Sequence, residues 1–439
     1  MIATAAPALA PAEAARRASA GGRGFWLSSP ASPPLRRARD LVGALPVGLI
    51  EGTTLADLDR LEEAWRRARV AWGAGGPPPP GVPVAVGWLS YELGRRLVGL
   101  PPDPRAAGQP LFSFQFFDAV WTCSADTEPA AAILAQDGAA ARRLTAALAR
   151  PLPPPRPPRL GALQAVDPEL RFLAAVRRIL AYELAGDTYQ VNLSRRLSAD
   201  WHEGEPVSLA AALRASAPAP QAAFIAEGPG RAIVGNSPER FLSLSCDGVV
   251  ETCPIKGTRP RAAMSAVDAE VVTELCASPK DRAEHVMIVD LERNDLGRVC
   301  RVGSVEVTAL ARVVSLATVH HLESTVRGTL RPGVGLAGLL AATFPGGSIT
   351  GAPKRRAMEI IDELEPRPRG LYTGATGWLG AAGDLDLAIA IRTGTLADGR
   401  LELSVGGGVV IESTPEGELA ETAVKARAFA ALAGAAPPA

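Results

Sequence analysis

The apolar positions of the chain fall into helical and strand-like stretches, and the clearest helical one lies near the middle. Apolar residues recur every three or four positions at Phe172, Leu173, Val176, Ile179, Leu180 and Leu184. This spacing places them on one face of a helix. Asp167 can cap this helix, Pro168 suits its first turn, and Gly186 suits the position after its end. The pattern therefore predicts an amphipathic helix between residues 167 and 186.

Strands are predicted on both sides of this helix. Apolar and polar residues alternate over 189–197, which is typical of a strand with one buried face. Other strand-like stretches are 84–89, 111–120, 232–234, 241–244, 304–307, 388–395 and 401–405. Further helices are predicted over 279–293, 353–363 and 415–432. Because the strands cluster in hairpin-like groups with few intervening helices, we expect an α+β fold.

The length of the chain and its proline tracts suggest how it is organised. A chain of 439 residues is too long for one simple core. The proline-rich stretch 151–158 predicts a stiff, extended connector. We therefore expect an N-terminal region over 1–150 and a catalytic region over 160–439.

Composition and charge narrow the class of protein. The net charge is zero, so neither a nucleic acid nor an anionic membrane is an expected partner. The five cysteines are scattered without CxxC spacing, which supports neither a zinc ribbon nor a disulfide framework. The apolar stretch 334–344 is too short to span a bilayer, and the first twenty residues lack the parts of a signal peptide. We expect a cytoplasmic protein that acts on a small molecule.

Lysine is rare in this chain. Of the 46 basic residues only four are lysine, and the rest are arginine. A desolvated lysine can lose its proton and act as a nucleophile, whereas arginine stays charged. Lys256 follows an apolar strand and precedes Gly257, which makes it the best nucleophile candidate. The alternative is that Lys256 is an ordinary solvent-exposed lysine in a turn.

Two predicted helices present acidic residues on one face. Asp281 and Glu284 are three positions apart in the first, and Glu418, Glu421 and Lys425 share a face of the second. Carboxylates from two helices can converge on Mg²⁺, which keeps several waters and needs only one or two of them. Acids near a helix start also simply complement the helix dipole, and spacing alone leaves both interpretations open.

Three other features could serve an anionic substrate. Glu239 could be a general acid, or only an ion-pair partner of a nearby arginine. The glycine-rich stretch 346–354 does not match a P-loop, but it suits an anion at a helix start. Arg392 lies in an apolar stretch, where an anionic partner would offset the cost of its burial.

Together these segments resemble the chorismate-utilising enzymes, and among them the component I subunits of aminodeoxychorismate synthase. The motifs include Ser-Pro-Glu-Arg-Phe at 237–241 and Pro-Ile-Lys-Gly-Thr at 254–258. The other matching segments are 186–194, 284–295, 320–324, 346–354, 372–377, 390–393 and 406–425. The N-terminal region matches more loosely, through 26–29 and 87–94. The resemblance implies a large α+β fold of two β-sheets packed face to face, with helices outside.

The resemblance also implies a set of site residues. Glu284 and Glu421 would bind Mg²⁺, which would hold the ring carboxylate of chorismate. Asp281 and Glu418 would lie next to these ligands. The implied substrate-binding residues are Asn192, Gly257, Thr258, His321, Thr350, Tyr372, Arg392, Gly406 and Lys425.

Lys256 separates the branches of the family. Relatives that form anthranilate carry Ala at this position. The similarity implies that the neutral Lys256 amine adds to C2 of chorismate while Glu239 protonates the departing C4 hydroxyl. Ammonia would then attack C4 and expel the lysine, which gives 4-amino-4-deoxychorismate. Gln190 stands where the isochorismate and salicylate branch tends to carry Lys, which argues against water as the nucleophile.

The resemblance also implies a partner that supplies ammonia, and two alternative functions stay open. No cysteine sits in the glycine-flanked turn of a glutamine amidotransferase, so a separate amidotransferase subunit is expected to supply ammonia. The product would lead to para-aminobenzoate, either for folate biosynthesis or for a specialised metabolite. One alternative is anthranilate synthase component I. The other is a non-catalytic regulatory subunit that binds chorismate, or binds tryptophan near residues 26–29.

Overall fold

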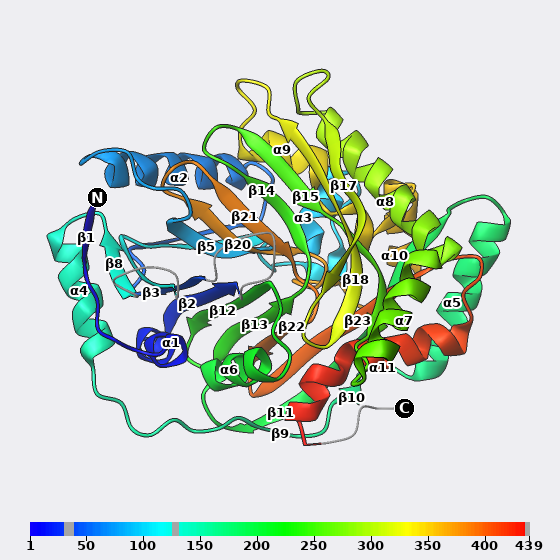
Figure 1. Ribbon diagram of the computed structural model, residues 1–439, viewed down its shortest axis with the longest axis horizontal. Helices are drawn as coiled ribbons and strands as arrows, with labels where there is room; N and C mark the ends of the chain where they lie inside the picture. Colours follow the sequence, from blue (N-terminus) through cyan, green and yellow to red (C-terminus); the bar gives the residue numbers. More distant parts are fainter. Residues whose placement is uncertain (30–38, 125–130, 435–439) are drawn as a thin grey trace.

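Two antiparallel β-sheets organise the chain, and helices cover their outer faces (Figure 1). The computed structural model describes residues 1–29, 39–124 and 131–434. Within these residues the sheets contain 13 and 10 strands. The α+β fold of two stacked sheets with helices outside, predicted from the sequence, is therefore confirmed.

The first sheet has the strand order β1-β8-β7-β3-β2-β12-β13-β22-β23-β11-β10, with β19 and β9 also paired to β11. Its strands are β1 (Ile2–Ala5), β2 (Arg23–Ser29), β3 (Arg39–Ala44), β7 (Ala119–Cys123), β8 (Ala131–Ala135), β9 (Arg159–Leu160), β10 (Gln164–Ala165), β11 (Gln190–Glu203), β12 (Gln221–Gly228), β13 (Arg231–Ser237), β19 (Gly351–Ala352), β22 (Thr393–Ala397) and β23 (Arg400–Val409). The long β11–β23 pair forms the end of this sheet at which the site residues gather.

The second sheet has the order β16-β18-β15-β14-β21-β20-β5-β6-β4, and β17 also pairs with β18. Its strands are β4 (Gly48–Gly52), β5 (Pro83–Leu89), β6 (Phe112–Phe116), β14 (Arg240–Leu244), β15 (Val249–Cys253), β16 (Ile255–Pro260), β17 (Glu306–Ser315), β18 (Val319–Thr329), β20 (Ala375–Gly380) and β21 (Leu385–Ile389). β16 and β18 contribute the site residues of this sheet.

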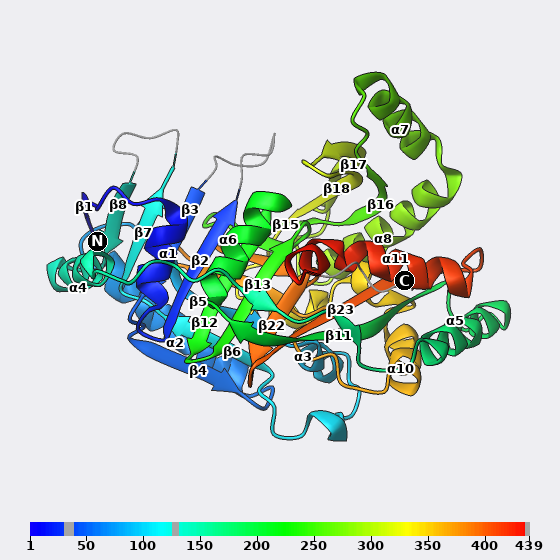
Figure 2. The ribbon, with the colours of Figure 1, turned by 90° about the horizontal axis from the view of Figure 1, so that it is seen from below.

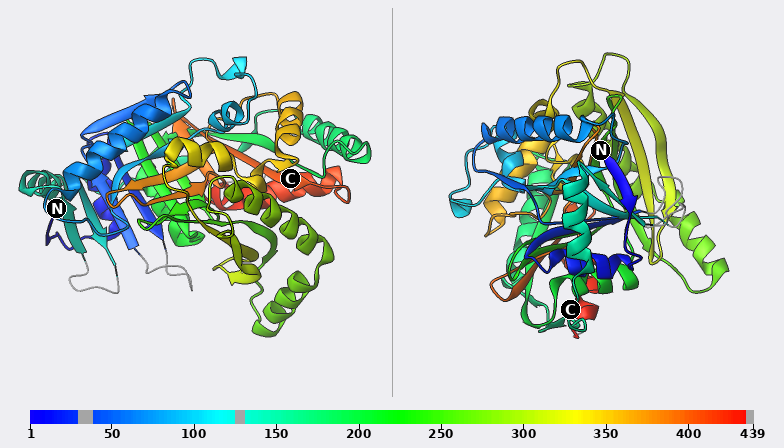
Figure 3. Two further views of the ribbon diagram at one scale, coloured as in Figure 1. Left: turned by 90° about the horizontal axis from the view of Figure 1, so that it is seen from above. Right: turned by 90° about the vertical axis from the view of Figure 1, so that its left-hand side faces the viewer.

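Helices cover the outer faces of both sheets. Those along the first sheet are α1 (Pro11–Ser19), α4 (Gly138–Ala149), α6 (Pro206–Ser216) and α11 (Pro415–Leu432), seen in Figure 2. Those against the second sheet are α2 (Asp57–Gly73), α3 (Tyr91–Leu97) and α9 (Leu336–Thr343), seen in Figure 3. Beside β11 lie α5 (Glu169–Leu184) and α10 (Lys354–Leu364), while α7 (Ser265–Ala277) and α8 (Pro279–Gly297) flank β16 and β18. Short 3-10 turns occur at Pro104–Ala106 and Gly347–Ile349.

Apolar side chains from the two sheets meet in a shared core. Phe25 and Ile225 come from the first sheet, and Val86 and Trp378 come from the second. All four are buried. Burying this apolar area is the main force that holds the sheets face to face.

The two regions predicted on either side of the proline connector share both sheets. β2 pairs with β12 in the first sheet, and β5 pairs with β20 in the second. The connector itself has no helix or strand over 151–158. The boundary between 1–150 and 160–439 stays a prediction, and residues 30–38, 125–130 and 435–439 of these regions lie outside the described residues.

The helix predicted after the connector is present, but its start differs from the prediction. Pro168 takes the N-cap position of α5 and no side chain caps the helix. The Asp167 carboxylate instead accepts a hydrogen bond from Arg367 Nε at 3.2 Å. Gly186 has a φ of 82°, which suits its predicted place after the helix end.

Two of the predicted strands are wrong, because each of these stretches contains parts of two separate strands. The stretch 111–120 divides into β6 and β7, which belong to different sheets, so the chain crosses between the sheets there. The stretch 388–395 is interrupted between β21 and β22, at a left-handed Arg392 with a φ of 49°. Both breaks follow from the stacking of sheets, which local apolar patterns do not encode.

A cavity of about 410 Å³ lies between the sheets, and none of the predicted catalytic or metal-binding residues lines it. Leu27 and Ser28 line it together with Trp378 and the buried Arg240–Asp386 ion pair. No helix in the described part of the chain is long and apolar enough to cross a membrane. All five cysteines are free.

Candidate active site

The predicted site residues gather where β11 and β23 approach β16 and β18, beside α8 and α11 (Figure 2). A Cβ atom built on Gly408 of β23 would lie 2.6 Å from Gln190 Nε2 and 3.3 Å from Lys256 Nζ. Gln190 belongs to β11 of the first sheet, and Lys256 belongs to β16 of the second. One glycine without a side chain therefore lets residues of both sheets meet in a single site.

Lys256 lies on β16 at an irregularity in the pairing with β18. Gly257, next in the chain, has a φ of 65°, a conformation that side chains disfavour. Burial lowers the pKa of the Lys256 amine, while the carboxylates of Glu284 and Glu239 oppose this lowering. An amine with a lowered pKa is more often neutral, which is the form that acts as a nucleophile.

Glu239 lies between β13 and β14, with its side chain almost completely buried. Burial raises the pKa of this carboxyl to about 7, and the nearby Lys256 opposes the shift. The backbone N–H of Ile255 donates to Glu239 Oε1 at 3.4 Å. The Ser348 hydroxyl lies beside the carboxyl without a hydrogen bond of standard geometry. A carboxyl with a pKa near 7 can both hold and release a proton at neutral pH.

A second buried acid, Glu292, was missed by the sequence analysis. It lies on α8, is 6% exposed, and accepts a hydrogen bond from Thr252 Oγ1 at 2.7 Å. Burial raises the pKa of Glu292 to about 8, and the neighbouring Glu239 adds to the shift. Glu292 lies eight residues after Glu284, about two turns further along the same helix. This spacing is the sequence signal that could have identified Glu292.

The two predicted acidic helices are present, and a side chain caps the start of each. Ser278 accepts a hydrogen bond from the backbone N–H of Asp281 at 3.3 Å at the start of α8. Thr414 does the same for Gly417 at 3.2 Å at the start of α11. These caps fix the helix starts and thus the rows of acids that follow them.

The acids of these helices have different surroundings. Burial raises the pKa of Glu284 above its usual value, against the opposing charges of Lys256 and Lys280. Partial desolvation also acts on the Glu421 carboxylate, whose side chain is 51% exposed, but the Lys425 ammonium, 2.6 Å away, outweighs it and holds the pKa of Glu421 below its usual value. Glu418 is buried and accepts a hydrogen bond from the Ser413 hydroxyl at 2.6 Å.

Asp281 forms an ion pair with an arginine. Its carboxylate accepts a hydrogen bond from Arg259 Nη2 at 3.0 Å, within an ion pair at the base of α8. That Asp281 lies next to the metal ligands Glu284 and Glu421 stays a prediction.

The donor set at this site fits a hard divalent cation. Among the described residues, no group of three or more His, Cys, Asp or Glu side chains is arranged to hold a metal ion. Two carboxylates, Glu284 and Glu421, suffice for Mg²⁺ because it keeps several waters. Burial and the nearby Glu412, Glu284 and Glu418 raise the pKa of Glu183 to about 8, and both of its buried oxygens lack a hydrogen-bond partner. Crowded carboxylates of this kind favour a cation between them.

Glycines of β23 bring α11 close to the sheet. A Cβ atom on Gly407 would lie 2.9 Å from Glu418 Oε2 and 3.2 Å from Glu421 Oε1. Lys425 Nζ donates to the carbonyl oxygen of Gly406 at 2.7 Å. The predicted substrate-binding residues Gly406 and Lys425 are therefore in direct contact.

Arg392 lies in the loop between β21 and β22, in the left-handed conformation noted above. Burial lowers the pKa of its guanidinium, and Glu239 opposes this effect. Its carbonyl oxygen accepts a hydrogen bond from the backbone N–H of Asn236 at 3.0 Å, which anchors the loop. A non-glycine residue held in this conformation is common at ligand-binding sites.

Asn192, Thr350 and Tyr372 come from three segments and are all buried. The backbone N–H of Asn192 donates to the carbonyl oxygen of Thr350 at 2.9 Å. The side-chain oxygen of Asn192 is buried without a partner, which leaves it free to bind a ligand. Burial raises the pKa of the Tyr372 hydroxyl above its usual value, so it is protonated and can donate.

His321 and Thr258 face each other across β18 and β16. Thr258 Oγ1 and His321 Nδ1 are 2.8 Å apart and share a hydrogen bond. Burial lowers the pKa of His321 to about 3, so the imidazole is neutral at physiological pH. Its Nε2 atom is buried and lacks a partner, which leaves one polar atom for a ligand.

A family model described as chorismate binding enzyme matches residues 25–431 of this chain. The chain is 40% identical over 370 residues to anthranilate synthase component 1 3 of Haloarcula marismortui, which covers 79% of this chain and 72% of that protein. It is 41% identical over 350 residues to aminodeoxychorismate synthase component 1 of Salmonella typhimurium, covering 79% and 76%. It is 48% identical over 242 residues to aminodeoxychorismate synthase of Streptomyces pristinaespiralis, but spans only 33% of that protein.

The fold also resembles solved structures. The crystal structure of anthranilate synthase component I from Streptococcus pneumoniae TIGR4 superposes with a TM-score of 0.76 at 29% identity. The match covers 91% of this chain and 93% of that one. The architecture of this chain is therefore similar to that of a protein named anthranilate synthase component I.

Proposed function

The chain belongs to the family of chorismate-binding enzymes, and on that premise we propose that it is component I of an aminodeoxychorismate synthase. The observation that carries this proposal is Lys256, a half-buried amine with a lowered pKa close to the buried acid Glu239. A subunit that only binds chorismate needs neither a neutral amine nor a protonated acid. This pairing is chemically suited to a covalent route.

In the proposed reaction the neutral Lys256 amine bonds to C2 of chorismate. The ring double bonds shift, the C4–O bond breaks, and the hydroxyl leaves as water with the proton that Glu239 donates. Ammonia then bonds to C4 and gives its extra proton back to Glu239, the double bonds shift back, and the C2–N bond to Lys256 breaks. The balance is chorismate plus ammonia giving 4-amino-4-deoxychorismate plus water.

The rest of the site would hold and orient the substrate. Glu284 and Glu421 would hold Mg²⁺, which supplies positive charge for the ring carboxylate. Arg392, Tyr372 and Lys425 would bind the enolpyruvyl carboxylate. Asn192, Thr350 and His321 would line the pocket, and the backbone at Gly257, Thr258 and Gly406 would allow a close approach of the substrate.

The ammonia is proposed to come from a separate glutamine amidotransferase subunit. Relatives that match most of this chain are named as component 1, which implies a second component. The product would serve the formation of para-aminobenzoate and folate. This assignment of partner and pathway rests on the relatives and on the motifs of the chain.

Anthranilate synthase component I is the second candidate, because a relative of that name matches 79% of this chain. Anthranilate formation releases pyruvate, and its enzymes carry Ala where this chain has Lys256. The lysine therefore favours the first candidate.

The experiment that separates the two is product analysis by mass spectrometry. Purified protein is incubated with chorismate and an ammonium salt, with and without Mg²⁺, and pyruvate is measured in parallel. We expect Mg²⁺-dependent formation of an aminated product that retains the enolpyruvyl group. Anthranilate with pyruvate would support the second candidate, and isochorismate or salicylate would refute both.

A further inference from the structure

A single buried arginine connects several segments of the candidate site. Arg369 follows α10 and is only 5% exposed. Its guanidinium has five N–H donors, and all five have an acceptor. The acceptors are Glu365 Oε1 at 2.7 Å, Glu365 Oε2 at 2.9 Å, the Asn192 carbonyl oxygen at 2.6 Å, the Ile349 carbonyl oxygen at 3.1 Å and Thr373 Oγ1 at 3.1 Å.

Two aromatic rings also lie against this guanidinium. Its central carbon is 4.7 Å from the ring centroid of Tyr91 and 5.6 Å from that of Tyr372. Cation–π contacts of this kind fix the orientation of the ring as well as the cation. Tyr372 is one of the residues proposed to bind the substrate.

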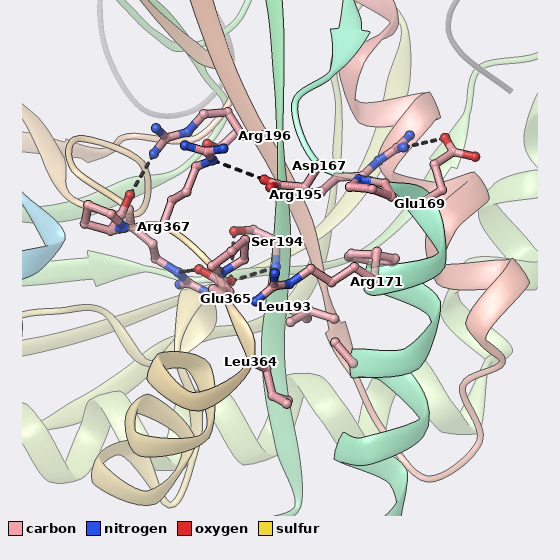
Figure 4. A pocket seen from close by; sticks show the side chains of 17 residues that line it. Asp167, Glu169, Arg171, Leu193, Ser194, Arg195, Arg196, Leu364, Glu365 and Arg367 are labelled. Carbon is pink, nitrogen blue, oxygen red and sulfur yellow. Dashed lines mark hydrogen bonds and ion pairs between the residues drawn. The ribbon is translucent and has the colours of Figure 1, made fainter. Parts of the chain in front are cut away.

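The partner carboxylate, Glu365, is itself anchored to the sheet. Its Oε1 atom accepts hydrogen bonds from the backbone N–H and the hydroxyl of Ser194, both at 2.9 Å. Figure 4 shows Glu365 reaching from the end of α10 to Ser194 on β11. Glu365 therefore ties the Arg369 guanidinium to β11, two residues after Asn192.

Thr373, another acceptor of Arg369, holds an unfavourable backbone conformation. Its φ is 58°, in the left-handed region that a β-branched residue rarely adopts. Its backbone N–H donates to the carbonyl oxygen of Ala390 at 3.0 Å, two residues before Arg392. The guanidinium thus helps to hold a strained turn between Tyr372 and the Arg392 loop.

We propose that Arg369 is a positioning residue that sets the shape of the chorismate pocket. It holds the backbone of Asn192 and of the residue before Thr350, and it holds the ring of Tyr372. This inference rests on the proposed function, because those three residues are the ones assigned to the substrate. No contact between Arg369 and the substrate is required.

A lysine could not take over this role. Lysine offers three donors on one nitrogen, without the planar fork that reaches acceptors in several directions. At position 369 it could pair with Glu365, but it could not also hold the carbonyl groups at 192 and 349. The charge would be kept and the geometry lost.

The test compares Arg369→Lys and Arg369→Gln with a matched control, Arg95→Lys. Arg95 is also buried, but its partners are Asp103, Asp362 and the Pro101 carbonyl oxygen, none of which is assigned to the substrate. Chorismate affinity is measured by calorimetry without ammonia, kcat and KM are measured with ammonia, and each Tm is measured by circular dichroism. All assays are run at a temperature at which each variant is fully folded.

We expect kcat/KM of both Arg369 variants to fall about 100-fold, with weaker chorismate binding, because small displacements in a site have effects of this size. Arg95→Lys should lower the Tm but leave kcat/KM and chorismate affinity within about twofold. Wild-type affinity and kcat/KM in folded Arg369→Lys, or an equal loss in Arg95→Lys, would overturn the proposal.

A third variant, Thr373→Val, covers the case in which the Arg369 variants do not fold. It removes one acceptor of the guanidinium and nearly preserves the shape of the side chain. We expect chorismate affinity to fall severalfold, about the value of one hydrogen bond. Unchanged affinity in this variant would count against the proposal.

The design separates this inference from the proposed function. The affinity measurement does not depend on which product the wild type makes, so a different product overturns only the proposed function. Wild-type protein that does not bind chorismate would overturn both.

Discussion

Burial moves the proton affinities of Lys256 and Glu239 in opposite directions, and both shifts suit the proposed reaction. The pKa of the amine is lowered and that of the carboxyl is raised to about 7. Desolvation disfavours the charged form of each group, so a single physical cause gives a neutral base and a neutral acid. The two groups also attract each other when charged, which limits both shifts.

Replacing the lysine tests the nucleophile directly. We expect Lys256→Ala to lower the rate of 4-amino-4-deoxychorismate formation by more than about 10³-fold, a scale typical of losing a nucleophile. Lys256→Arg should be equally inactive, because guanidinium stays protonated. The measurement is product formation at saturating ammonia and Mg²⁺. An Arg variant with substantial activity would show that only positive charge is needed.

The pH profile tests the acid. Glu239 is protonated below its pKa of about 7 and loses the proton above it, so kcat/KM for chorismate should fall as the pH rises through about 7. The amine works in the other direction, since its neutral fraction increases with pH. The concentration of free ammonia must be held constant across the series, because ammonium also titrates.

Glu239→Gln serves as the matched variant for this profile. It cannot donate a proton, and we expect a loss of about 10²-fold or more, without the descending limb near pH 7. A wild-type profile that is flat across this range would remove Glu239 from the proton transfer.

Among the elements, strand β23 shapes the site through its glycines, because the absence of side chains lets other segments come close to the strand. Gly407 lies against the acids of α11, and Gly408 lies beside Gln190 and Lys256. Alternate residues of a strand point to opposite faces, so two neighbouring glycines bring the helix close on one face and the second sheet close on the other. The strand predicted over 401–405 ends before these glycines, whereas β23 continues to Val409.

We expect Gly408→Ala to reduce kcat/KM by about 10-fold to 10²-fold, since the new Cβ would displace Gln190 and crowd the Lys256 amine. Gly297→Ala, at the end of α8, is the matched control because its Cβ would meet no atom within 4 Å. The control should change stability by less than about 1 kcal/mol and leave kcat/KM unchanged. Equal kinetics for the two variants would contradict the close packing at Gly408.

At the scale of the whole molecule, the two predicted regions interleave. The antiparallel pairs β2–β12 and β5–β20 join strands from before and after the proline connector. The core between the sheets contains residues from both regions as well. Folding of one region therefore requires strands of the other.

We expect residues 160–439, expressed alone, to show no cooperative thermal unfolding transition, because the unpaired strands and the inner apolar face would be exposed. Coexpression with residues 1–150 should restore a soluble complex. The measurement is calorimetry of the fragment beside the full chain. A sharp transition in the isolated fragment would mean that it folds on its own.

The sequence by itself determined the local features of this protein. Helix starts at prolines 279 and 415 follow from cap residues and neighbouring side chains, so they are readable from a few consecutive positions. The rarity of lysine among the basic residues singled out Lys256 as the candidate nucleophile. The ordered motifs predicted the family, which the match over residues 25–431 confirms.

Only the tertiary structure decided which distant residues share a space. It divided 111–120 between two sheets, brought Gln190 and Lys256 together beside Gly408, and buried Glu292 next to Glu239. It also gave Arg369 five acceptors on four separate segments. Burial and hydrogen-bond satisfaction depend on what surrounds a residue in three dimensions, and the neighbours along the chain do not specify those surroundings.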